Sequence, residues 1–239
     1  MKKISSVFLL LLVLLTPLDA APNPTDAGMG TPMAETEKKA VIEHLNGLQK
    51  NINSITAKAS QIKKTNLLKK ELRSEGAVSL KKPNLMRWEI NKPEKTITAV
   101  DGEKMTTYRP KAKEAELYDL SENIIARNAI NFFSSSINMS LDELEKKFSV
   151  NIYRTSDNFV FELKPKSKMT SKYLEVIYIW YNQKNGLPSE FEVISSNSDK
   201  THTWLTDIVV NPDLSPDMFR LTLPDEVWIT NKVSPAASN

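Results

Sequence analysis

Histidine is the usual starting point of a proton-transfer site, and the sequence contains only two, His44 and His202. His44 falls on the apolar side of a predicted helix, where a packed or partly exposed structural role is the simpler interpretation. His202 stands at the start of a predicted strand between two threonines, where a surface position is expected. The patterns H-E-x-x-H and G-x-S-x-G, which would mark a metalloprotease or a serine hydrolase, do not occur.

Paired carboxylates are the next residues that could do chemistry. Asp142 with Glu143 is predicted to cap a helix, and Glu190 with Glu192 to form the solvent face of a strand. The sequence has 0 Cys, which excludes thiol catalysis, thiolate metal sites and disulfides, and its 6 Gly form no phosphate loop. The net charge of +3, with both signs interspersed, is not typical of a nucleic-acid-binding protein. We therefore expect a binding protein without cofactor or metal, and not an enzyme.

The N-terminus has the pattern of a secretory signal peptide. Two lysines precede nine apolar residues, Val7–Leu15, and a small-residue exit ends at Ala20. The apolar run is too short for a membrane span, which needs roughly 20 residues. The predicted parts are a signal peptide (1–20), a Pro/Gly-rich flexible linker (21–34), one domain (35–230) and a flexible tail (231–239). Export to the periplasm of a diderm bacterium is therefore expected.

The elements that would position any site follow the order helix, strands, helices, strands. Residues 35–50 have the apolar spacing of an amphipathic helix, and residues 53–120 alternate as strands, with Gly76 predicting a bulge or bend. Residues 121–149 predict two helices, after which strands return. We expect an α+β fold in which a large antiparallel sheet of about 10–11 strands curls into an unclosed β-barrel, with about three α-helices as a lid.

Methionine and aromatic residues are spread over the predicted strands and central helices. For any single residue an ordinary core position is the simpler interpretation. A curled sheet with helices over its mouth can nevertheless leave an apolar space inside. Methionine adapts to many shapes, which favours a site that accepts varied ligands.

One segment carries a family resemblance. Residues 80–88, LKKPNLMRW, resemble a signature of the LolA family of periplasmic lipoprotein carriers: a basic residue, Pro-Asn, two apolar residues and a Trp. Further segments resemble other motifs of that family in the same order: Pro93, Asp101-Gly102, Tyr108-Arg109-Pro110 and the tail 219–224. The resemblance extends over roughly residues 35–229. The resemblance implies an unclosed antiparallel barrel with a helical lid. It also implies a carrier that takes triacylated lipoproteins from an inner-membrane ABC transporter to an outer-membrane acceptor.

The resemblance also implies roles for single residues. Lys82 occupies the position at which the family has an arginine that holds the empty carrier's lid closed. Lysine lacks the planar fork of arginine, so either Lys82 acts as a weaker lid latch or Arg87 compensates. Met86 falls where the family has an apolar rim residue that engages the transporter. The predicted ligand-binding residues are Met86, Trp88, Ile90, Met105, Ile125, Phe132, Phe133 and Trp180.

Three functions remain open from the sequence. The first is a monomeric lipoprotein carrier, for which the physical need is plain, because each exposed acyl CH₂ costs about 0.8 kcal/mol in water. The second keeps the fold but carries or senses another lipid, such as a glycolipid; the absence of a second domain speaks against an envelope-stress regulator. The third is a lipid-ester hydrolase with His44 or His202 as its base.

Overall fold

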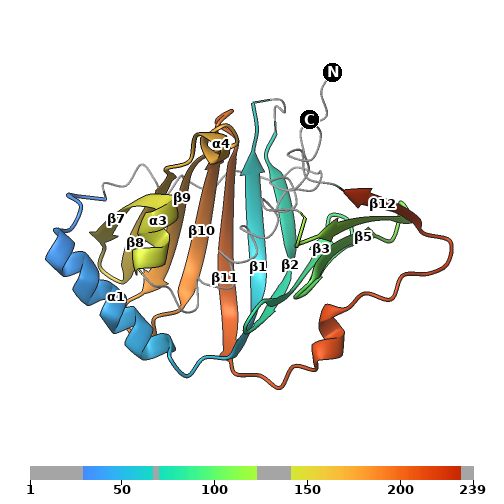
Figure 1. Cartoon of the computed structure of the whole chain (residues 1–239), viewed down its shortest axis with the longest axis horizontal. Coiled ribbons are helices and arrows are strands. Elements are labelled where there is room, and N and C mark those ends of the chain that lie inside the picture. Colours follow the sequence, from blue (N-terminus) through green and yellow to red (C-terminus); the bar gives the residue numbers. More distant parts are fainter. Residues whose placement is uncertain (1–28, 67–69, 123–140, 233–239) are drawn as a thin grey trace.

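The structure is a computed structural model that describes residues 29–66, 70–122 and 141–232. Its dominant element is one 12-stranded sheet that curls strongly, so that β1 and β2 stand upright in Figure 1 while β3 and β5 run obliquely. The predicted signal peptide lies outside the described residues, as do Ile125, Phe132 and Phe133. The expected curled antiparallel sheet with helices is confirmed, with one strand more than predicted.

The first half of the sheet is built from consecutive hairpins. Its strands are β1 (Ser54–Lys64), β2 (Leu72–Lys81), β3 (Leu85–Lys92), β4 (Thr96–Asp101), β5 (Lys104–Arg109) and β6 (Glu114–Asp119). The second half contains β7 (Phe148–Arg154), β8 (Asn158–Pro165), β9 (Leu174–Asn182), β10 (Pro188–Ser195) and β11 (Lys200–Val210). The two halves join where β1 pairs with β11, in the order β12-β6-β5-β4-β3-β2-β1-β11-β10-β9-β8-β7.

The remaining elements of the described chain are three α-helices, one 3-10 helix and a last strand. They are α1 (Glu35–Gln49), α3 (Leu141–Lys147), α4 (Lys168–Ser171) and the 3-10 helix η2 (Pro216–Phe219). The strand β12 (Trp228–Lys232) pairs with β6 and is parallel to it, whereas all other pairs are antiparallel. Residues 219–221 end η2 and continue without regular structure.

The strand registers define two faces of the sheet. On the face that we call inner, Phe161 is level with Ile179 of β9, which is level with Phe191 of β10. On the opposite, outer face, the next residues along give a row of Glu162, Tyr178 and Glu192. Because side chains alternate along a strand, neighbouring residues in one strand lie in different environments.

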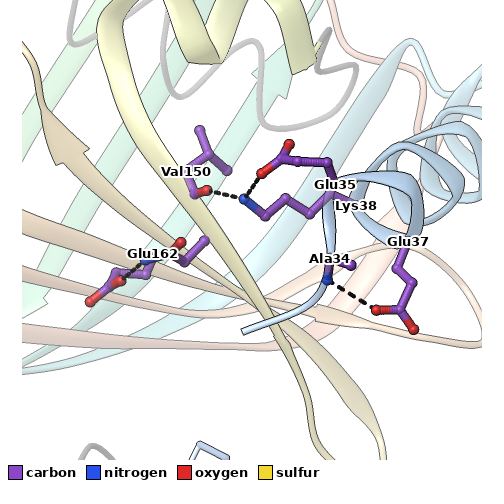
Figure 2. Close-up of polar contacts among 7 residues, drawn as sticks. Ala34, Glu35, Glu37, Lys38, Val150 and Glu162 are labelled. Carbon is purple, nitrogen blue, oxygen red and sulfur yellow. Dashed lines mark hydrogen bonds and ion pairs between the residues drawn. The ribbon is translucent and has the colours of Figure 1, made fainter. Parts of the chain in front are cut away.

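The helix α1 packs on the inner face of the second half. Val41, Ile42 and Leu45 are buried and share one hydrophobic cluster with Phe161. Figure 2 shows how its first turn is fixed: the Lys38 ammonium donates to the Val150 carbonyl at 2.9 Å and pairs with Glu35 at 2.7 Å. The nearly buried lysine therefore has both charge and hydrogen bonds satisfied, and it ties the helix to the edge strand β7.

Residues 211–227 form a strap along the outer face of the first half. The Lys81 ammonium donates to the Leu214 carbonyl at 2.6 Å, and the Arg87 guanidinium donates to the Met218 carbonyl at 2.7 Å. Phe219, at the end of η2, is 1% exposed. The strap thus reaches the far edge of the sheet, where the Trp228 amide donates to the Lys113 carbonyl at 2.8 Å and β12 begins.

Candidate functional site: the inner face of β2–β5

Four of the predicted ligand-binding residues lie together on the inner face. Met86, Trp88 and Ile90 alternate along β3, and the register carries the row from Met86 through Val100 of β4 to Met105 of β5. Met86, Ile90 and Met105 are buried, and Trp88 is partly buried against the same cluster. The arrangement is an apolar surface with two flexible thioethers and one indole, which suits flexible apolar ligands.

Gly76 lets β2 and β3 bend at this surface. A Cβ atom at Gly76 would lie 1.8 Å from the Glu89 carbonyl oxygen, which no other residue could tolerate without displacing β3. The register between the two strands shifts between Glu75 and Gly76. The predicted bulge is therefore confirmed, and it stands beside Ile90, the partner of Gly76 on the inner face.

Lys82 lies at the rim, in the turn between β2 and β3. Its backbone amide donates to the Asn53 carbonyl at 2.8 Å, which fixes the turn to the start of β1. Its ammonium makes no hydrogen bond or ion pair with any residue in the described ranges. Burial lowers the pKa of Lys82, as expected for a half-buried ammonium without a counter-charge.

Arg87 does not lie beside Lys82 on the inner face. It points to the outer face, where it pairs with Glu89 and donates to Met218 of η2. The suggestion that Arg87 compensates for a missing latch arginine meets a physical obstacle, because its donors already hold the strap. Because side chains alternate along a strand, Arg87 points to the face opposite that of its neighbours Met86 and Trp88.

Trp180 also lies apart from the other predicted ligand-binding residues. It is on the outer face of β9, between Tyr178 and His202, with ring centroids 6.0 Å and 5.4 Å away. Trp204 stacks further along, 4.1 Å from His202. The prediction placed Trp180 at the ligand, whereas the structure places it in an aromatic row on the other side of the sheet.

Two glutamates bracket His202 in that row. The imidazole contacts Glu190 at 2.9 Å through Nε2 and Glu192 at 3.2 Å through Nδ1. Burial alone would lower the pKa of His202, but the hydrogen bonds and negative charges of both glutamates outweigh it and raise that pKa. The expectation that His202 and Glu192 are surface residues is wrong: His202 is 5% and Glu192 1% exposed. The signal in the sequence was the shared two-residue spacing of Glu190/Glu192 and His202/Trp204.

A second polar group on the outer face surrounds Glu162. Its carboxylate accepts hydrogen bonds from Asn151 at 2.7 Å and from the hydroxyls of Tyr153 and Tyr178 at 3.2 Å and 3.1 Å, and it pairs with Lys164 at 3.0 Å. Burial would raise the pKa of Glu162, but these donors outweigh it and lower that pKa. Burial and the Glu162 charge raise the pKa of both tyrosines.

The two histidines contact carbonyl, carboxylate and aromatic groups. The His44 Nε2 atom contacts the Gln183 carbonyl at 3.1 Å, and its ring meets the edge of Phe159. His202 contacts carboxylates and indoles, with no serine or threonine hydroxyl among its contacts in the described chain. Within the same ranges no group of acidic residues and histidines is arranged to hold a metal ion, and no helix is long and apolar enough to cross a membrane.

Comparison with known proteins shows which family this chain resembles in sequence and fold. An outer-membrane lipoprotein carrier protein from Pseudomonas paraeruginosa is 24% identical over 200 residues, covering 83% of this chain and 91% of that relative. A Haemophilus ducreyi protein of the same description is 25% identical over 161 residues, covering 66% and 69%. An uncharacterized conserved protein from Thermus thermophilus has a similar fold, with a TM-score of 0.50 at 8% identity over 82% of this chain and 99% of that one.

The family model described as outer membrane lipoprotein carrier protein LolA matches residues 50–222, which include all of β1 to β11 and η2. That range contains the inner-face residues Met86, Trp88, Ile90 and Met105 together with the rim residue Lys82. The chain therefore belongs to the LolA family.

Proposed function

We propose that this protein is a periplasmic carrier that binds the acyl chains of lipoproteins on the inner face of β2–β5. It would receive them from a transporter in the inner membrane and deliver them to an acceptor in the outer membrane. The observation that carries the proposal is the convergence of Met86, Trp88, Ile90 and Met105 on one apolar surface in a member of this family.

The chemistry of that surface suits release as well as binding. Dispersion and hydrophobic contacts have no preferred direction, so chains of different length and saturation can occupy the same surface. A bound chain is removed from water, yet it loses no hydrogen bond when it leaves for a membrane. A carrier needs this balance, because it must hold its cargo less well than the acceptor does.

The site can be located with a photocrosslinker that replaces one tryptophan at a time. Trp88 and Trp204 form a matched pair, because both are partly buried indoles on neighbouring parts of the sheet but on opposite faces. We expect p-benzoylphenylalanine at Trp88 to crosslink to a triacylated lipoprotein in periplasmic extracts, and the same group at Trp204 to give none. Equal crosslinking from both positions would contradict an inner-face site.

The cargo itself is identified by native mass spectrometry of protein isolated from the periplasm. A bound triacylated protein supports the lipoprotein carrier. A glycolipid as the only bound species would show that the same fold serves another lipid.

Lys82 is proposed as the lid latch at the rim. Its half-buried ammonium without a partner in the described chain is the supporting observation. Lys82→Leu should slow cargo transfer, and Lys82→Arg should preserve it, because both cations can bind a carbonyl or carboxylate. Transfer at the normal rate by Lys82→Leu would place the latch elsewhere.

A further inference from the structure

One end of the molecule carries a cluster of lysines. The connection from β8 through α4 to β9 contains Lys164, Lys166, Lys168 and Lys172 within residues 164–173, with no acidic residue. The C-terminus of α3 adds Lys146 and Lys147, since the Lys166 amide donates to the Lys147 carbonyl at 2.9 Å. In Figure 1 α4 stands at the extremity of the sheet, above β9 and β10. We call Lys146, Lys147, Lys166, Lys168, Lys172, Met169 and Tyr173 the basic tip.

The five lysines of the basic tip lie close together, whereas several lysines of the sheet are paired with carboxylates. Lys58 and Lys92 pair with Asp207 and Glu75, and Lys164 itself pairs with Glu162. None of the five forms an ion pair with another residue of the described chain, and all five are exposed. The Lys166 ammonium donates to the Glu145 carbonyl at 2.6 Å. Within residues 141–147 and 164–173 six lysines outnumber three acidic residues, so the local field is positive.

Two exposed apolar or aromatic side chains adjoin these lysines in the sequence. Met169 is 52% and Tyr173 37% exposed, and both are among the exposed large hydrophobic side chains of the described chain. Hydrogen bonds fix the backbone that presents them: the Ser196 hydroxyl donates to the Lys172 carbonyl at 2.7 Å, and Ser167 caps α4. These hydrogen bonds therefore fix the backbone of the tip in the fold.

We propose that the basic tip docks the protein onto membrane surfaces that carry anionic lipid headgroups. The lysines would bind the headgroup phosphates, and Met169 and Tyr173 would enter the boundary between headgroups and acyl chains, where tyrosine is favoured. A fluid lipid surface can receive a protruding tip without a pre-shaped pocket, which an acidic protein partner would have to supply. This inference goes beyond cargo binding, because docking needs no lipoprotein.

The test is flotation of the cargo-free protein, purified from the periplasm after expression of the full chain, with lipid vesicles. Phosphatidylcholine vesicles with and without phosphatidylglycerol separate headgroup charge from bilayer alone. We expect binding only where phosphatidylglycerol is present, and loss of that binding in about 0.5 M NaCl, where charges are screened beyond a few ångströms. Equal binding to both vesicles, or none to either, would overturn the proposal, the second outcome leaving an acidic protein as the partner.

Two variants show whether the tip is responsible. The variant K166Q/K168Q/K172Q should lower the vesicle partition coefficient at least about tenfold, since each lysine near an anionic surface contributes. The matched control K39Q/K50Q/K184Q removes the same charge from exposed lysines away from the tip and should bind like the parent protein. M169S/Y173S should weaken binding while leaving its salt dependence. Equal losses in the control and the tip variant would refute the assignment of docking to this end of the molecule.

Discussion

The two faces of the sheet use the same strands for opposite purposes. On the inner face, Phe161 and Ile179 are 0% exposed and belong to the hydrophobic core cluster. One residue further along the same strands, Glu162 and Tyr178 are joined by a hydrogen bond of 3.1 Å on the outer face. Contacts of the first kind have no preferred direction, whereas contacts of the second kind require particular atoms at particular distances.

The two kinds of contact suit different tasks: the first suits ligand binding, and the second suits holding the shape of the sheet. A surface that must accept varied acyl chains gains from non-directional contacts, but such contacts do not fix how far a sheet curls. The group around Glu162 joins β7, β8 and β9 by hydrogen bonds, and the group around His202 joins β10 and β11. We infer that these directional bonds help to hold the curvature of the sheet.

The largest expected effect is on the inner face. Phe161→Ala should lower the free energy of unfolding by about 3–5 kcal/mol, because a fully buried ring is lost and a cavity remains. Urea unfolding followed by tryptophan fluorescence measures the change. A loss below about 1 kcal/mol would mean that the inner face repacks freely, which the close packing of this cluster argues against.

A smaller loss is expected from the neighbouring residue on the outer face. Glu162→Gln keeps the shape but replaces one carboxylate oxygen by an amide donor facing Asn151, Tyr153 and Tyr178, and should cost about 1–3 kcal/mol. The lowered pKa of Glu162 also has a pH signature. Its contribution is present above the unfolded value of 4.5 and is lost as pH falls through the lower folded pKa. The variant should therefore lose less stability on acidification than the parent protein.

His202 should give the opposite pH signature with a smaller loss of about 1 kcal/mol. Its raised pKa stabilises the fold fully below the unfolded value of 6.5, and the contribution disappears as pH rises through the folded pKa. His202→Gln should therefore narrow the difference in unfolding midpoint between mildly acidic and alkaline buffer. An unchanged pH profile would show that the two glutamates do not depend on the imidazolium.

The smallest effect is expected from an exposed pair on the same outer face. Lys58 and Asp207 are 2.7 Å apart, but their side chains are 73% and 64% exposed. Lys58→Gln should leave the urea midpoint unchanged within error, because solvent screens such a pair. A clear shift would extend the structural role of the outer face beyond its two buried rows.

Sequence alternation predicted the inner face of β3 well. Met86, Trp88 and Ile90 alternate with the charged Arg87 and Glu89. The three apolar side chains therefore share one face of the strand, and the alternation assigns that face to the interior. β9 lacks this contrast, because Trp180 and Ile179 are both apolar and alternation cannot say which of them faces the core. Local alternation therefore does not assign Trp180 to either face.

Pairings distant in sequence were beyond the reach of local patterns. His202 is buried by Glu190 and Glu192, which stand on the next strand and look like solvent-face charges when β10 is considered alone. Arg87 binds Met218, which is 131 residues away. Charge, polarity and spacing within one strand do not contain these partners, since they depend on how the sheet and the strap are assembled.

The parallel strand β12 has a consequence for how the protein is made. It pairs with β6, yet it follows every other strand of the described chain, so this edge can close only after β11 and the strap have been synthesised. Until then the backbone of β6 is an open edge that another strand could join. During synthesis, the interval between the appearance of β6 and that of β12 is therefore the time when this edge is open to wrong strand pairing.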